Sequence, residues 1–126
     1  MKVVYSECAN RDLHRFREFM SQNDIQPETI GRVLDGLLHS IETLADLPLL
    51  GFSLSERRRI PLPYRILLAN PYIVVYDVHS DAHSQVVEII RIFHQKEDYI
   101  RTLIGNEPST QRGRFFLCCV IEPSGV

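Results

Sequence analysis

The chain has 126 residues, the length of one domain, with 44% hydrophobic and 24% charged residues. This composition is too apolar and too mixed in charge for a disordered protein, and no apolar run approaches the roughly 20 residues that span a bilayer. The formal net charge of −2 excludes a global attraction to nucleic acid, so a polyanion site would need local clustering of basic residues. Because the first residues turn polar too early for a signal peptide, we expect a cytoplasmic protein without membrane contact.

The first half of the chain predicts one strand and two helices. Residues 2–5 are β-prone, and apolar residues then recur at helical spacing over 13–20. Pro27 begins the second helix, because proline loses no hydrogen bond at the first helical position. Over 30–47 apolar residues recur at steps of three and four, which places them on one face, and Pro48 ends this helix.

The second half predicts a meander of three strands. The strands are rich in Val, Ile and Tyr and cover residues 64–69, 72–78 and 85–93. The basic stretch 52–63 before them reads as a loop, and residues 97–104 after them predict a short final helix. Helices early and strands late indicate an α+β domain, with two helices packed on one face of a small, mainly antiparallel sheet. The other face is then free to carry a site.

Residues 79–84, between the last two strands, contain His79, Asp81 and His83 at alternate positions. Two imidazoles and a carboxylate are chemically suitable ligands for Zn²⁺. Metal sites, however, hold their ligands with further hydrogen bonds, which a solvated hairpin tip does not supply. We therefore interpret the segment as a polar turn and expect neither a metal ion nor a cofactor.

Two groups of basic residues stand out as candidates for a functional site. Arg57, Arg58 and Arg59 are consecutive in the basic loop, and they form either a solvated surface or a binding site for phosphates or partner carboxylates. Arg91 interrupts an apolar row, since a regular strand places it on one face with Val87, Ile89 and Phe93. Such an arginine indicates either a buried ion pair or a site residue.

The order of elements and several short motifs together resemble the RelE/ParE toxin superfamily of bacterial type II toxin-antitoxin systems. PETIGRVLDGLLHSIETLADLPLLG resembles the family's helix with its Pro-Gly stop, and Tyr64-Arg65 opens a strand like the family's Tyr-Arg strand. YIVVYDV resembles the neighbouring strand, and VEIIRIFHQKEDY resembles the closing strand with an Arg-x-x-His signature and a charged turn. The resemblance places a toxin domain at 1–104 and a C-terminal extension at 105–126.

This resemblance implies a toxin neutralised by a cognate antitoxin that lays an extended or helical segment over it. The expected assembly is a homodimer or a toxin-antitoxin hetero-oligomer. The superfamily holds two activities, inhibition of DNA gyrase in ParE-like members and ribosome-dependent mRNA cleavage in RelE-like members. The RNase branch carries basic residues on its central strands, whereas YIVVYDV has none, which favours the ParE-like activity. A third alternative is an inactive homologue that only binds the antitoxin.

RNA cleavage without a metal needs a base, an acid and cations around one phosphodiester. The candidate residues for this catalytic set are Arg65, Arg91, His94, Lys96 and Tyr99. Arg91 with His94 is the first candidate for function, and we expect Arg91→Ala to abolish growth inhibition while the fold stays intact, because burying an arginine carries a desolvation cost. For antitoxin binding, we expect Arg57 to Arg59 to meet acidic residues of the partner.

The C-terminal extension contains one further apolar run, RFFLCCVIEP, which is β-prone and too short to cross a membrane. An exposed run of this kind promotes aggregation, so we expect it to be buried on its own sheet, against a second copy or beneath the antitoxin. The three cysteines are Cys8, Cys118 and Cys119, which form neither a CxxC spacing nor an even disulfide framework. We expect them to be reduced thiols.

Overall fold

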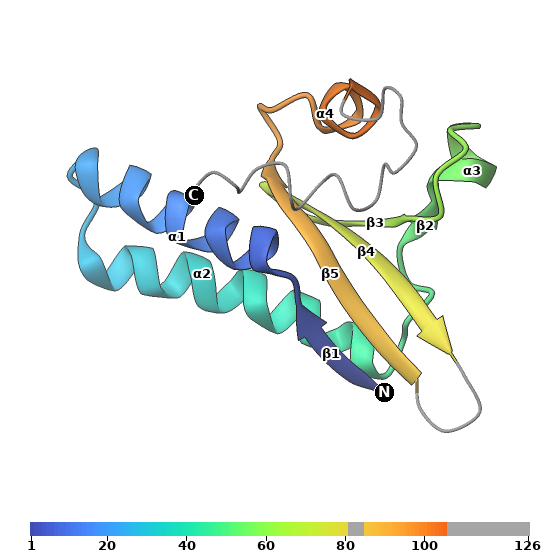
Figure 1. The fold of residues 1–126 in the computed structure, drawn as a ribbon. Coiled ribbons are helices and arrows are strands. Elements are labelled where there is room, and N and C mark those ends of the chain that lie inside the picture. The colour runs from blue at the N-terminus through green and yellow to red at the C-terminus, as the bar shows by residue number, and fades with distance from the viewer. Residues whose placement is uncertain (81–84, 106–126) are drawn as a thin grey trace.

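The computed structural model describes residues 1–80 and 85–105. Its elements are β1 (Lys2–Tyr5), α1 (Glu7–Gln22), α2 (Pro27–Glu42), the 3-10 helix η1 (Thr43–Ala45), β2 (Phe52–Ser53), α3 (Leu54–Arg57), β3 (Arg65–Ala69), β4 (Tyr72–Ser80), β5 (Gln85–His94) and α4 (Tyr99–Gly105). The strands form one sheet in the order β1-β5-β4-β3-β2 (Figure 1). β1 runs parallel to β5, and the other pairs are antiparallel. The predicted α+β class and mainly antiparallel sheet are confirmed.

The helix boundaries follow from local chemistry. Ser6 precedes α1, and its hydroxyl accepts a hydrogen bond of 3.0 Å from the Ala9 amide, as a helix N-cap does. Pro27 opens α2 at the predicted position. The α-helix ends earlier than predicted, because its last turn continues as η1 before Pro48. Within the described ranges, no helix combines the length and apolarity needed to cross a membrane.

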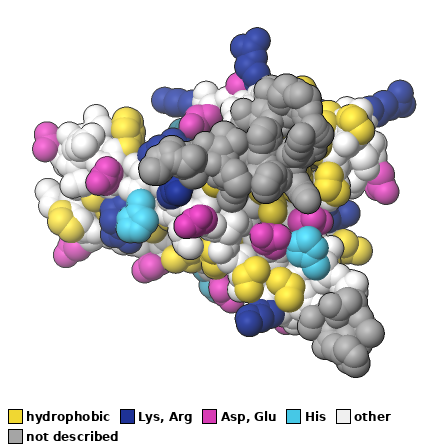
Figure 2. Space-filling view, in the orientation of Figure 1, with side chains coloured by type: hydrophobic (Ala, Val, Ile, Leu, Met, Phe, Trp, Pro, Cys, Tyr) yellow, Lys and Arg dark blue, Asp and Glu magenta, His cyan; other side chains and the backbone are white. Residues whose placement is uncertain are grey.

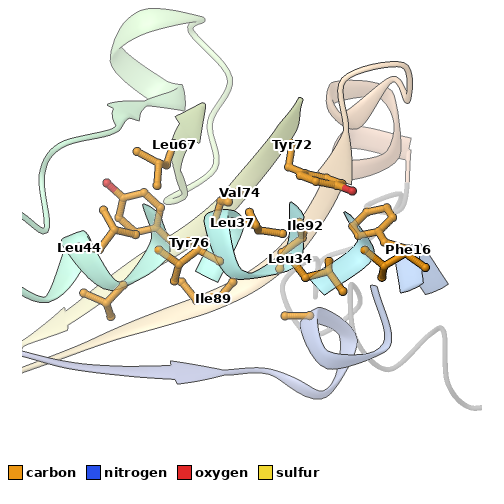
Figure 3. Packing of buried hydrophobic residues seen from close by; sticks show 14 of the residues in the cluster. Phe16, Leu34, Leu37, Leu44, Leu67, Tyr72, Val74, Tyr76, Ile89 and Ile92 are labelled. Atoms are coloured by element: carbon orange, nitrogen blue, oxygen red, sulfur yellow. The ribbon is translucent and has the colours of Figure 1, made fainter. Parts of the chain in front are cut away.

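The main hydrophobic core lies between the α1–α2 hairpin and one face of the sheet (Figure 3). It includes Phe16 from α1, Leu34 and Leu37 from α2, and Val74 and Tyr76 from β4. Tyr76 is fully buried, and its hydroxyl donates to the Pro48 carbonyl at 2.8 Å and accepts from the Gly51 amide at 2.9 Å. The phenol thus fixes the segment that follows α2 against the sheet.

A second core covers the opposite face of the sheet, which we expected to be free. Leu54 of α3 and Leu103 of α4 are buried there with Ile66, Val75 and Phe93. Figure 1 shows α4 on the side of the sheet away from α1 and α2. The expectation of a helix-free face is therefore wrong. The sequence SLSE contained the signal for α3, since the Ser53 hydroxyl caps this helix by accepting from the Glu56 amide at 3.3 Å.

A β-bulge in β5 alters the expected alternation of side chains. Val75 pairs with Arg91 and Tyr76 with Ile89, which leaves Ile90 as the extra residue. Ile89 consequently packs in the main core with Val87, while Phe93 packs in the second core. The predicted single row of Val87, Ile89, Arg91 and Phe93 is wrong, because a regular alternation cannot anticipate an inserted residue.

Gly51 is a position where a side chain does not fit. A Cβ atom there would lie 2.3 Å from the Ile66 carbonyl oxygen and 2.8 Å from the Tyr76 hydroxyl. We expect Gly51→Ala to lower the free energy of unfolding by about 1–3 kcal/mol, because the backbone of β3 must shift. Gly36→Ala is the control, since a Cβ there meets nothing within 4 Å. This helix substitution should stabilise by about 0.5–1 kcal/mol. Urea denaturation of both variants tests the expectation, and equal stabilities would contradict it.

Candidate functional site

Asp12 of α1 lies at the edge of β5 where the strand pairing with β1 has ended. The last paired residues are Tyr5 and Ile89, so the amide groups of β5 beyond this point have no partner strand on that side among the described residues. The Asp12 carboxylate accepts a hydrogen bond of 2.8 Å from the Ile92 amide and is only 3% exposed. A side chain of the helix therefore completes the hydrogen bonding of the strand.

Arg91 forms a buried ion pair with the same carboxylate. Its Nε lies 2.9 Å from Asp12 Oδ2 and its Nη2 lies 3.1 Å from Asp12 Oδ1, which is bidentate geometry. The guanidinium also lies over the Phe93 ring, 4.8 Å from its centroid. Burial alone would lower the pKa of Arg91, but the hydrogen bond and the charge of Asp12 raise it above its ordinary value. Of the two alternatives for Arg91, the structure supports the buried ion pair.

A chain of charges extends from this ion pair to the surface. Arg15 donates to Asp12 and to Glu97, both at 3.2 Å. Glu97 in turn accepts a hydrogen bond of 2.8 Å from the His94 amide. The network therefore connects α1 with the turn between β5 and α4. Its two outer members are partly exposed, so the Arg15–Glu97 pair contributes less stability than the buried pair.

A surface groove of about 450 Å³ lies over this network, and we call it the α1 groove. Its lining consists of Arg15, Phe16, Phe19, His94, Lys96 and Glu97. Phe19 is 63% exposed, which is unusual for a ring of this size. His94 Nδ1 accepts a hydrogen bond of 3.1 Å from the Lys96 amide, which fixes the orientation of the imidazole. The groove combines an aromatic wall with a rim of charges of both signs.

Two of the five catalytic candidates line the α1 groove, and Arg91 is connected to them through Asp12, Arg15 and Glu97. His94 and Lys96 share the α1 groove, while Tyr99 packs against the Phe93 ring in the second core. Arg65 pairs with Tyr76 on the face of the main core, and its Nη2 donates to the Gly51 carbonyl at 2.6 Å. Arg91 pairs with Val75, which belongs to the opposite face. Arg65 and Arg91 therefore start from opposite faces of the sheet.

The consecutive arginines 57–59 are all exposed at the end of α3. Arg57 lies over the Phe52 ring, 4.8 Å from its centroid, which is a cation–π arrangement. Arg59 has a φ of 57°, a left-handed conformation that turns the chain. The Arg57 guanidinium therefore lies beside the short edge strand β2, and the exposed Arg58 and Arg59 follow it in the chain.

The proposed polar turn lies only partly within the described residues. β4 and β5 pair as far as Ser80 and Gln85, so His79 belongs to the strand. Its Nε2 lies 2.9 Å from Glu88 Oε1, a cross-strand contact. Asp81 and His83 lie outside the described residues, and within the described ranges no cluster of three metal-ligating side chains is found.

Sequence reasoning missed Asp12, Arg15 and Glu97. A signal for Asp12 was present, because it lies four residues after Cys8 and four before Phe16, on the buried stripe of α1. A carboxylate on a buried stripe requires a cation or amide donors nearby. Its partners, however, are 79 and 80 residues away in the chain, so no local pattern identifies them.

We expect Arg91→Ala to lower the free energy of unfolding by about 3–5 kcal/mol, because Asp12 then remains buried without its counter-ion. The double variant Asp12→Ala/Arg91→Ala should lose less than the sum of the single variants. Arg17→Ala on the exposed face of α1 is the control and should change stability by less than about 0.5 kcal/mol. Denaturant unfolding measures the unaltered protein, the two single variants, the double variant and the control. An Arg91→Ala protein of normal stability that fails to inhibit growth would instead make Arg91 a functional residue, as first expected.

The fold is similar to that of a chain from a solved toxin-antitoxin system. A chain of the chromosomal ParDE TA system from P. aeruginosa superposes with a TM-score of 0.60 at 17% identity, covering 75% of this chain and 95% of that chain. The YoeB/ParE toxin from Agrobacterium tumefaciens gives a TM-score of 0.47 at 20% identity, with 75% and 98% covered. No curated protein matches the sequence.

The sequence also matches the model of a protein family. That family is described as ParE toxin of type II toxin-antitoxin system, parDE, and the match covers residues 3–99. The matched range includes all of β1 except Lys2, the α1–α2 hairpin, the remaining strands and the first residue of α4. The chain therefore belongs to the ParE toxin family of type II toxin-antitoxin systems.

Proposed function

We propose that this toxin acts by binding and inhibiting DNA gyrase and does not cleave mRNA. The proposal rests on one observation: the two arginines among the candidate catalytic residues lie on opposite faces of the sheet. A metal-free RNase needs a base, an acid and cations within hydrogen-bond reach of one phosphodiester, about 3 Å from the reacting oxygens. Here Arg65 and Arg91 begin on opposite faces of the sheet and are held by structural partners.

The remaining pair in the α1 groove supports the same conclusion. His94 and Lys96 lie beside the Arg15–Glu97 ion pair, so the Glu97 carboxylate already pairs with one of the cations of the groove. Recognition of an RNA backbone depends on clustered basic side chains. The face seen in Figure 2 instead shows Lys and Arg side chains scattered among acidic ones. The side chains visible there form no continuous basic patch of the kind that attracts a polyanion.

A protein target suits the α1 groove better. Protein interfaces are organised around buried aromatic anchors with a polar rim, and exposed rings are frequent energetic centres. Phe19 supplies such a ring, with Phe16 beside it and Arg15 and Lys96 at the rim. We propose the α1 groove as the surface that contacts gyrase.

We expect the purified toxin to inhibit DNA supercoiling by gyrase and to leave translated mRNA uncut. Phe19→Ala should weaken inhibition of supercoiling at least about tenfold. A residue at the energetic centre of an interface contributes about 1.4 kcal/mol or more to binding, and that free energy corresponds to a tenfold change in affinity. Leu47→Ala is the control, because Leu47 is similarly exposed but does not line the α1 groove. Supercoiling assays and primer extension on ribosome-bound mRNA give the two readouts. Cleavage that disappears in His94→Ala would favour the RNase, and absence of both activities would leave an antitoxin-binding module.

We further propose a cognate antitoxin as the partner of this toxin, with Arg57, Arg58 and Arg59 facing its acidic residues. Their exposure at one end of the molecule makes a local positive surface in a chain of net charge −2. Complementary charge of this kind mainly accelerates association and adds specificity. The partner is therefore expected to be small and acidic.

Changing all three arginines to glutamate should slow antitoxin association by about tenfold or more at low salt and by less at high salt. The control variant changes Lys2, Arg17 and Arg101 to glutamate, which alters the net charge equally at exposed positions on other elements. Surface plasmon resonance with the antitoxin encoded beside the toxin measures the rates. Equal effects of the two variants would show that only net charge matters.

A further inference from the structure

The outer edge of β3 is open over half of its length. β2 pairs only with Arg65 and Ile66, so Leu67 to Ala69 have no neighbouring strand on that side among the described residues. The Leu54 amide donates to the Tyr64 carbonyl at 3.1 Å, which shows that Tyr64 directs its peptide groups outward. Because these directions alternate along a strand, the amide and carbonyl of Leu68 also point outward, toward the open edge.

Two grooves flank this edge and share Leu68. One, of about 440 Å³, includes Leu50, Phe52, Arg57 and Leu68 in its lining. The other, of about 450 Å³, separates the edge from α2 and is lined in part by Arg32 and Val33. Leu68 is 64% exposed and Leu50 53% exposed. An added strand would direct alternate side chains into the two grooves, which is the geometry of recognition by strand addition.

We propose that residues 115–121, FFLCCVI, add to the open edge of β3 as a further strand of the chain's own sheet. These residues belong to the C-terminal extension and lie outside the described residues. The run is uninterrupted by charge, proline or glycine, which is the composition that strand pairing and burial favour. An exposed β edge beside apolar side chains invites intermolecular pairing unless a segment covers it.

The extension starts close enough to the edge for this docking. Leu103 of α4 is buried in the second core together with Leu54 and Ile66, which are residues beside and within β3. Gly105 ends α4 two positions later. Residues 106–114 then span up to about 30 Å when extended, at about 3.3–3.6 Å per residue. A loop of that length can pass from α4 to the open edge.

Two observations favour this occupant over a separate partner. The family match ends at residue 99, and the similar ParDE chain covers 75% of this chain, so the extension lies beyond the shared fold. A tethered segment also binds at a high effective concentration and needs fewer contacts than a free one.

Disulfide trapping in the full-length protein tests the placement. With the centre of the run opposite residue 68, the adjacent Cys118 and Cys119 place one thiol on the face of residue 68 and within disulfide reach. We expect Leu68→Cys to form an intramolecular disulfide with one of them when oxidised glutathione is the oxidant. Phe19→Cys is the matched control, equally exposed but located in the α1 groove. The expected yield for Leu68→Cys is at least tenfold above the control, by mass spectrometry of non-reduced peptides.

Other trapping results overturn the proposal. Equal yields at both positions would indicate random collision, a preference for Phe19→Cys would place the run in the α1 groove, and intermolecular disulfides alone would indicate a second copy. A second measurement does not depend on cysteines. Hydrogen exchange of the Leu68 amide should be at least tenfold slower in the unaltered chain than in Leu117→Pro, since proline cannot join the ladder. Amides of β4 serve as the internal control, and equal exchange at Leu68 in both proteins contradicts the docking.

Discussion

The carboxylate of Asp12 joins α1 to β5, two elements that lie far apart in the sequence. It accepts from the Ile92 amide in β5, pairs with Arg91 on the same strand and contacts Arg15 one turn along α1. A buried charge with these partners is stable, whereas the loss of one partner costs about 3–5 kcal/mol. That loss is a large part of the about 5–15 kcal/mol that stabilises an ordinary domain. The position of α1 against β5 therefore depends on this one group.

The shape of the α1 groove depends on the contacts of Asp12. Asp12 fixes α1 along β5, and Arg15 extends the contact to Glu97 in the turn before α4. The Glu97 carboxylate then accepts a hydrogen bond from the His94 amide, and the His94 ring accepts one from the Lys96 amide. The rim of the groove thus consists of residues whose orientations are fixed by neighbours. Such preorganisation lowers the entropy lost when a protein target binds.

The sequence predicted the parts of the fold that depend on local patterns. Pro27 marked the start of α2, and the enrichment in Val, Ile and Tyr identified β3, β4 and β5. The bulge at Ile90 was not predictable, because inserting one residue leaves the composition of a strand unchanged. The small helices on the second face were underestimated for a related reason. Four residues such as Leu54–Arg57 are too few to show a helical period.

The candidate site was predictable only where its members are neighbours in sequence. His94 and Lys96 were chosen together and do share the α1 groove. Arg65 and Arg91 were grouped with them by chemistry, but the strand register places these two on opposite faces. Asp12 and Arg15 escaped notice because their partners outside α1, which are Arg91, Ile92 and Glu97, come from the other end of the domain. Long-range pairing therefore decides which polar residues remain free for function.

The parallel pairing of β1 with β5 has a consequence for the synthesis of this toxin. β1 comprises the first residues of the chain, and its partners Val86 to Ile89 are translated more than eighty positions later. Three contacts require β5 to be present. They are the pairing of β1 at the sheet edge, the hydrogen bond from the Ser6 amide to the Ile89 carbonyl, and the ion pair of Asp12 with Arg91. Local helices can form on the ribosome, but this part of the core closes only after β5 has left the exit tunnel. The folded toxin therefore arises late in its own translation, when nearly the whole domain has been made.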